Sequence, residues 1–442
     1  MVHYQPPQDW QQWVEWLAAG LHGRSRWRLS LILLGMVFAR GRRTVTTWLR
    51  AVGISDDFAD YYYFLQPLGR KSKTLALRLF VLLLEKVPVG ERLLLAVDDT
   101  PTKRYGPKVQ GAGIHHNPAP GPADQKFLYG HIWVTISLVL RHRLWGTIGL
   151  PLLGLLYVRL KDIGKIPAKH GWTFQTKLQL ALAALRELVA VAILAKKRVW
   201  IVFDGAYAKR PLLRPLRRAG ITVVSRLRKD AALRTVPPAP QRRQRGQPRK
   251  YGSQRIHLQR RAAHPAGWEQ VPCLVYGQLV TKTVKTFLAT WRPAGGIIRV
   301  VIVKEDHGCE FFFCTDPDAA PREIIEAFGD RAAIEQDFHD VKEIWGAGQQ
   351  QVRHIWTNVA VFNLNLWVHT LVECWAWHKP AEELCDRSAS PWDDPDRRPS
   401  HADRRNTLRR QTLHNEYLSL SAVHRASSKI RSLYERLLKL AA

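Results

Sequence analysis

Three carboxylate positions in the sequence have the residue type and placement needed to bind a divalent metal ion. Asp98 and Asp99 end an apolar run that begins at Leu93, Asp204 ends a second apolar run, and Glu335 lies in a stretch with helical signals. Apolar strands bring terminal carboxylates to the rim of a sheet, and hard oxygen ligands suit Mg²⁺ or Mn²⁺. Two such ions would clamp a phosphodiester. A single aspartate at a strand end more often forms a cap or turn, so the prediction depends on all three positions.

The segment around Glu335 carries further charged residues at helical spacing. At about 100° per residue, with Arg331 at 0°, Glu335 falls near 40°, Lys342 near 20° and Phe328 near 60°. One helical stripe would therefore hold an aromatic ring, a guanidinium, a carboxylate and an ammonium. A surface ion pair between Arg331 and Glu335 would explain those two residues. It would not explain why Lys342 returns to the stripe two turns later.

This spacing resembles a known family signature. Phe328-x2-Arg331-x3-Glu335-x6-Lys342 is similar to the Y-x2-R-x3-E-x6-K signature of DDE transposases of the insertion-sequence-four type, with Phe in place of Tyr. Two other motifs of that family are matched, a D-x-T start and an Asp-Gly-x-Tyr segment, at Asp98-Asp99-Thr100 and Asp204-Gly205-Ala206-Tyr207. The resemblance covers residues 92–365, more than half of the chain.

The resemblance implies a ribonuclease-H-like catalytic core in which Asp98, Asp204 and Glu335 hold two Mg²⁺ or Mn²⁺ ions. Asp99 is an alternative to Asp98 as the first ligand. Asp98 is favoured because Thr100 then stands where the D-x-T pattern has its threonine.

The resemblance also implies that Arg331 and Lys342 contact phosphates at the cleaved DNA end, which agrees with their charge. Phe328 lacks the tyrosine hydroxyl of the family pattern. We expect it to weaken one phosphate contact without affecting metal binding.

Composition and charge point to a nucleic-acid partner. The chain has 442 residues, a formal net charge of +30 and 46% hydrophobic residues, enough apolar content for a substantial core and too much for a disordered protein. A folded body with this charge needs a polyanion. Residues 231–261 contain nine Lys or Arg and no Asp or Glu. We expect an exposed arm that clamps the phosphate backbone, through Arg242, Arg243, Arg245, Arg249 and Lys250.

The hydrophobic pattern predicts an α/β fold, a ribonuclease-H-like mixed sheet core with an all-β insertion, flanked by N-terminal and C-terminal helical regions. One helix should run from Pro321 to Trp345, and a flexible linker should cover residues 379–408. The expected parts are a helical DNA-binding region (1–90), the first part of the core (91–230), the basic arm and β insertion (231–318), the second part of the core with the Glu335 helix (319–378), and a linker with a C-terminal helical region (379–442).

Several weaker signals have two interpretations. The basic segment Gly41–Ile54 resembles one helix of a helix-turn-helix, or is an ordinary amphipathic surface helix. His115 and His116 could position DNA or water, but a solvated loop pair is favoured. Trp291 could stack on an extruded base, but a core position is favoured. The five cysteines form no C-x-x-C pair, which argues against a zinc knuckle and a disulfide framework.

The function expected from these observations is that of a DNA transposase. It would bind double-stranded DNA, both the terminal inverted repeats of its element and target DNA, and act as a homodimer on DNA. No signal peptide or membrane span is predicted, which indicates a cytoplasmic protein. The alternatives are a domesticated DNA-binding protein that does not cut, and a ribonuclease-H-like nuclease of another pathway.

Overall fold

The computed structural model describes residues 4–117, 125–239, 247–387, 392–394 and 396–419, together with Tyr434. Two predictions fall outside this range. One is the part of the expected C-terminal helical region beyond residue 419, of which only Tyr434 is described. The other is part of the basic arm, namely Arg242, Arg243 and Arg245.

The N-terminal region is helical, as the sequence predicts. Its helices are α1 (Gln8–Ala18), α2 (Trp27–Phe38), α3 (Val45–Ala51), α4 (Phe58–Arg70) and α5 (Ser72–Lys86). The basic segment 41–54 contributes only the seven residues of α3, which begins where the Thr44 hydroxyl accepts the Thr47 amide N–H at 3.1 Å. Trp48 and Leu49 are fully buried, and α3 packs against α2. The apolar side of α3 therefore anchors it to the bundle and leaves Arg50 exposed.

The described strands form one twelve-stranded sheet in the order β2-β3-β1-β5-β6-β12-β11-β10-β7-β8, with β4 paired to β3 and β9 to β10. Among them β1–β5 and β5–β6 are the parallel pairs, and the other pairs are antiparallel. The strands are β1 (Arg92–Lys103), β2 (Gly113–His116), β3 (Phe127–His142), β4 (Gly146–Tyr157), β5 (Arg198–Phe203), β6 (Thr222–Arg226), β7 (Leu233–Arg234), β8 (Arg255–Ile256), β9 (Glu269–Val275), β10 (Gln278–Trp291), β11 (Gly296–Glu305) and β12 (Gly308–Cys314).

Helices cover both faces of the sheet. Two short 3₁₀ helices, η1 (Leu160–Lys165) and η2 (Ala168–His170), precede α6 (Lys177–Leu194). On one face Leu95 of β1 shares a core with Leu185 of α6. On the other face Ala96 packs with Ile324 and Ile334, which belong to α9 (Pro321–Asp330) and α10 (Ala333–Glu343). Since side chains alternate along a strand, consecutive residues of β1 meet different helices.

The remaining helices are α7 (Arg210–Arg218), α8 (Leu258–Ala263), α11 (Ile355–Ala376), α12 (Ala381–Leu384) and α13 (His401–Ser419). The central helix α11 is almost wholly buried and contacts β4, α4 and α13. Its Asn363 binds both backbone groups of Gly154 in β4, each at 2.9 Å. No described helix is long and apolar enough to cross a membrane.

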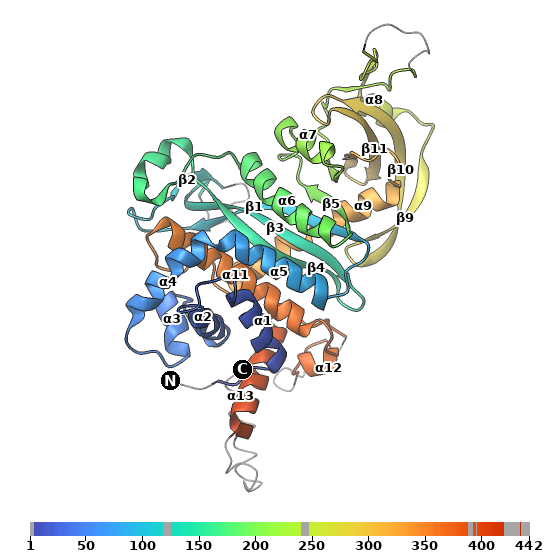
Figure 1. Ribbon diagram of the computed structural model, residues 1–442. Helices are drawn as coiled ribbons and strands as arrows, with labels where there is room; N and C mark the ends of the chain where they lie inside the picture. Colours follow the sequence, from blue (N-terminus) through green and yellow to red (C-terminus); the bar gives the residue numbers. More distant parts are fainter. Residues whose placement is uncertain are drawn as a thin grey trace.

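The architecture is a mixed α/β fold consistent with a ribonuclease-H-like core. The insertion strands β9 to β12 extend the core sheet, because β12 pairs with β6, and α8 lies before them at the end of the basic segment. In Figure 1 the insertion strands β9, β10 and β11 stand to one side of the helical body.

Three predicted element boundaries are wrong. The helix expected from Pro321 to Trp345 is two helices, α9 and α10. The linker expected through residue 408 is shorter, because α13 begins at His401. The strand expected to stop at Asp99 continues to Lys103, where its antiparallel pairing with β3 supplies hydrogen-bond partners; its parallel pairing with β5 ends at Val97.

Candidate active site

The parallel register of β1 and β5 brings Asp98 and Asp204 close together. The last paired residues are Val97 and Phe203, and each is followed directly by an aspartate. Neighbouring residues on paired strands point to the same face, so the register directs Asp98 and Asp204 to a common face of the sheet. Consistent with this, the charge of Asp204 raises the pKa of Asp98.

Asp98 and Asp99 have different partners because they lie on opposite faces of β1. Asp98 Oδ2 is 2.7 Å from Arg331 Nη1. Asp99 Oδ2 is 2.6 Å from Lys177 Nζ at the start of α6, and its Oδ1 accepts the Tyr207 hydroxyl at 3.0 Å. Asp99 is therefore held by structural contacts on the α6 side, whereas Asp98 faces the side covered by α9 and α10.

Arg331 joins two of the three acids. Its Nη1 binds Asp98 at 2.7 Å and its Nη2 binds Glu335 at 2.8 Å. The Arg331 side chain is only 14% exposed, whereas Glu335 is 60% exposed. The structure thus places the carboxylates of Asp98 and Glu335 on either side of a single cationic group. The Arg331–Glu335 pair is also the i,i+4 ion pair considered from sequence.

Arg331 lies at the break between α9 and α10, so the single-helix stripe predicted from sequence is wrong. The backbone amides of Arg331, Ala332 and Glu335 each bind a carbonyl three residues earlier. Such i→i−3 bonds are typical of a 3₁₀ turn, which advances about 120° per residue rather than 100°. Residues three apart eclipse one another in such a turn, so Phe328 stays on the side of Arg331, whose guanidinium lies 5.3 Å from the centre of the Phe328 ring.

The environment of Asp98 disfavours its charged form. Burial raises the pKa of Asp98 to about 6, and the neighbouring Asp99 and Asp204 carboxylates act in the same direction. Arg331 and the Asp99 amide N–H, which donates to Asp98 Oδ1 at 2.8 Å, oppose this shift. A nearby cation stabilises the charged form of such a buried carboxyl group, which makes Asp98 a candidate for binding a metal cation.

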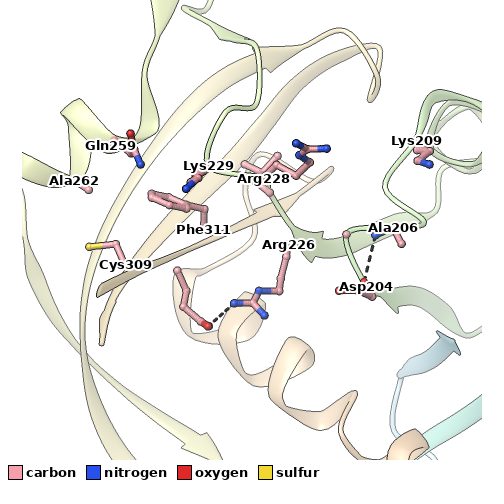
Figure 2. Close-up of a pocket in the computed structure, with 13 residues that line it drawn as sticks. Asp204, Ala206, Lys209, Arg226, Arg228, Lys229, Gln259, Ala262, Cys309 and Phe311 are labelled. Atoms are coloured by element: carbon pink, nitrogen blue, oxygen red, sulfur yellow. Dashed lines mark hydrogen bonds and ion pairs between the residues drawn. The ribbon is translucent and has the colours of Figure 1, made fainter. Parts of the chain in front are cut away.

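A pocket of about 830 Å³ opens beside Asp204 toward the β insertion. In Figure 2 Asp204 and Ala206 lie at one side, joined by a hydrogen bond, and Arg226, Arg228 and Lys229 project from the chain that crosses the pocket. Sequence analysis missed this basic group. The signal was present in the run Arg226-Leu-Arg-Lys229, which begins at the last residue of β6, but its closeness to Asp204 follows only from the β5–β6 pairing.

Phe328 and Lys342 do not meet at one point. The Phe328 ring packs on Phe312 with centroids 4.8 Å apart, and the guanidinium groups of Arg226 and Arg331 lie 5.9 Å and 5.3 Å from its centre. Phe328 therefore links the pocket to the acids. Lys342 instead lines a second pocket of about 930 Å³ with Thr102 and Gly348, and burial lowers its pKa.

The other predicted residues lie apart from the acids or outside the described range. Arg249 and Lys250 are exposed. His115 and His116 belong to β2 and not to a loop, and burial lowers the pKa of His115 to about 4. Trp291 is 8% exposed and packs edge-on against Phe313, which favours the core interpretation. All five cysteines are free thiols.

The donor set of this site suits a hard divalent ion. Asp98, Asp204 and Glu335 offer only carboxylate oxygens, the ligands that Mg²⁺ and Mn²⁺ prefer. Asp98 and Glu335 already share one cation, the Arg331 guanidinium. The donor chemistry of these residues therefore fits the cofactor that the sequence predicts, although among the described residues these three acids are not a group whose ligand atoms lie within 4.8 Å of one another.

Fold and site together define a class of protein, a ribonuclease-H-like α/β core whose acidic strand ends suit metal-dependent phosphoryl transfer. Residues 17–292 match the DDE superfamily endonuclease family. Because the match spans more than half of the chain, this protein belongs to that family, and the family supports a metal-dependent nuclease that acts on DNA. The matched range contains Asp98 and Asp204 and ends before Glu335. A comparison with curated proteins gives no match.

Proposed function

We propose that this protein is a DNA transposase of the insertion-sequence-four type, which binds the ends of its mobile element and carries out strand cleavage and strand transfer. One observation carries the proposal. Asp98 and Glu335, from two segments of the chain, bind the same Arg331 guanidinium, and the β1–β5 register brings Asp204 alongside. This arrangement supports a common site for the three acids and the arginine of the signature.

In this proposal Asp98, Asp204 and Glu335 are the catalytic residues and hold two Mg²⁺ or Mn²⁺ ions. Bound there, the ions would supply activated water and neutralise charge on the scissile phosphate. The half-buried position of Asp98 limits its access to water, which strengthens its electrostatic interactions. Asp99 positions β1 against α6 through Lys177 and Tyr207 and touches no substrate.

The basic side chains have a separate role, which is to bind the phosphate backbone. Arg331 pairs with both Asp98 and Glu335 in this structure; if these acids held metal ions instead, its guanidinium would be available to contact a phosphate at the cleaved end. Arg226, Arg228 and Lys229 line the pocket beside Asp204 and would hold the strand that enters it. Lys342, with Arg249 and Lys250 of the arm, would contact DNA further away.

Transposition joins two element ends, so we propose that the protein acts as a homodimer on double-stranded DNA. The test is cleavage of a DNA fragment that carries the genomic flanks of the gene, in Mg²⁺ or Mn²⁺. Wild type is run beside Asp204→Asn and Glu335→Gln, with Asp99→Asn as the matched control. Cuts at defined flank positions by wild type and the control, but not by the other two variants, support the proposal.

Other outcomes would contradict parts of it. Cuts scattered along the fragment would indicate a general nuclease, and tight binding without cutting by any variant would indicate a DNA-binding protein. Cutting by Glu335→Gln at the wild-type rate would remove Glu335 from the catalytic residues. A second assay, joining of the released 3′ end to a plasmid, tests strand transfer separately from cleavage.

A further inference from the structure

A second group of metal-ligating side chains lies away from the three acids, where α10, α11 and α13 meet. Asp340, His369 and His401 each come from a different one of these helices and are all buried. One ligand atom from each lies within 4.8 Å of the other two. Among the described residues, these three form the one group of histidine, cysteine or acidic side chains whose ligand atoms lie this close together.

His401 is oriented as metal-binding histidines are. Its Nδ1 is 2.5 Å from Glu373 Oε1, and Arg404 Nη1 lies 2.8 Å from the same oxygen. A carboxylate that takes the N–H of one ring nitrogen leaves the other as a lone-pair donor, the usual arrangement of a ligating histidine. That nitrogen, Nε2, accepts the Trp345 indole N–H at 2.8 Å. A cation would take the place of this single hydrogen bond.

His369 supplies a second and independent sign of a ligand. Its side chain is 3% exposed and its Nδ1 has no hydrogen-bond partner, a costly state for a buried polar atom. The ring stacks on His401 with centroids 3.9 Å apart. Glu373 Oε2 is also buried without a partner. A cavity of about 430 Å³ borders all of these residues and has room for a water molecule as a further ligand.

We propose that Asp340, His369 and His401 bind one Zn²⁺ ion. Two imidazole nitrogens and one carboxylate oxygen are ligands that Zn²⁺ accepts in tetrahedral sites, with water as the fourth. Mg²⁺ prefers oxygen ligands alone, so this site is chemically distinct from that of Asp98, Asp204 and Glu335. Ligand atoms around one Zn²⁺ ion lie closer together than 4.8 Å, and small side-chain rotations would bring them to that spacing.

The site would act on catalysis through position. Asp340 lies five residues after Glu335 on α10, and its two histidine partners belong to the buried helix α11 and to α13. A shared ion would therefore fix the helix that carries Glu335 against the rest of the protein. Asp340 and the two histidines are positioning residues in this proposal, because none of them lies among the three acids.

The test measures zinc binding by the full chain without DNA, so it does not depend on the proposed transposase activity. Chelator-treated protein is titrated with Zn²⁺ by calorimetry, and with Co²⁺ while its visible absorption is followed. We expect one Zn²⁺ per chain, Co²⁺ bands of a four-coordinate site, and a rise in Tm with Zn²⁺ that equimolar Mg²⁺ does not produce. Absence of zinc binding by folded wild type would overturn the proposal.

Variants distinguish this site from others on the surface. His369→Gln and Asp340→Asn should each weaken Zn²⁺ binding at least tenfold, whereas His307→Gln, at a 78% exposed histidine of the β insertion, should not. Glu335→Gln should also keep zinc binding, which separates this site from the three acids. Circular dichroism checks that each variant is folded. If His369→Gln does not fold, Asp340→Asn, which preserves side-chain size, tests the zinc site alone. Unchanged zinc affinity in Asp340→Asn would contradict the assignment.

Discussion

Asp98 and Asp99 are consecutive residues of β1 whose carboxylates bind cations on opposite faces of the sheet. Asp98 binds Arg331 at 2.7 Å, and Asp99 binds Lys177 at 2.6 Å. The alternation of side chains along a strand produces this division. One acid of the pair is thus on the face of Asp204 and Glu335, and the other stabilises the packing of α6 on the sheet.

Substitution of the two aspartates should separate catalysis from stability. Asp98→Asn should reduce cleavage by a factor of about 10³ or more, since it removes a proposed metal ligand. Asp99→Asn should retain cleavage and lose about 1 kcal/mol of unfolding free energy, because its partly exposed ion pair with Lys177 is weakened. Metal-dependent cleavage rates and urea denaturation measure the two effects. Loss of cleavage in Asp99→Asn with an intact fold would favour Asp99 as the ligand.

Glu326 should give the protein an acid-sensitive contact between α9 and the insertion. Burial alone would raise the pKa of Glu326, but the Leu274 amide N–H, Arg322 and Arg141 donate to its carboxylate and lower the pKa below its ordinary value of 4.5. The unfolded state then binds more protons near this pH, so the unfolding free energy contributed by Glu326 rises with pH. It is complete above about pH 4.5 and is lost as pH falls further.

The matching experiment compares Glu326→Gln with wild type by urea denaturation. At pH 7 the variant should lose about 2 kcal/mol, because hydrogen bonds to a charged acceptor are weakened. The difference should shrink toward pH 3, where wild-type Glu326 is protonated. Glu343→Gln, at an exposed position of α10, is the control and should show little change. A difference that is equal at both pH values would contradict this origin.

Gly69 should be essential for the packing of α4 on α11. A Cβ at this position would overlap the backbone carbonyl of Trp356, which cannot move without shifting α11. Gly69→Ala should therefore cost about 1–3 kcal/mol, as overpacking does in buried interfaces. Gly23→Ala, where a Cβ meets nothing within 4 Å, should change stability little. Thermal denaturation of both variants tests the prediction, and equal Tm values would refute it.

Lys342 should contribute to DNA affinity without specifying a sequence. Lys342→Ala should weaken binding to all duplexes and reduce the slope of log affinity against log salt by about 0.9, the value for one lost phosphate contact. Lys161→Ala, an exposed lysine of η1, is the control of equal charge. Fluorescence anisotropy over a range of salt concentrations measures both slopes. Identical slopes for the Lys342 variant and wild type would remove Lys342 from the DNA surface.

The sequence by itself determined the order of the elements in the core and the positions of the acids along it. The apolar runs before Asp98 and Asp204 form β1 and β5, and Thr176 begins α6 with a capping box formed by residues three apart in the chain. These features depend on hydrophobic periodicity and short-range hydrogen bonds, which neighbouring residues encode.

Only the tertiary structure decided which acid faces which partner. Arg331 and Asp98 are 233 residues apart in the chain, and their ion pair depends on how α9 and α10 pack on β1. The 3₁₀ break at Arg331 and the meeting of His369 with His401 were likewise invisible in local patterns. Contacts between distant segments arise when whole helices and strands bury their apolar faces together, and no single stretch of sequence records that outcome.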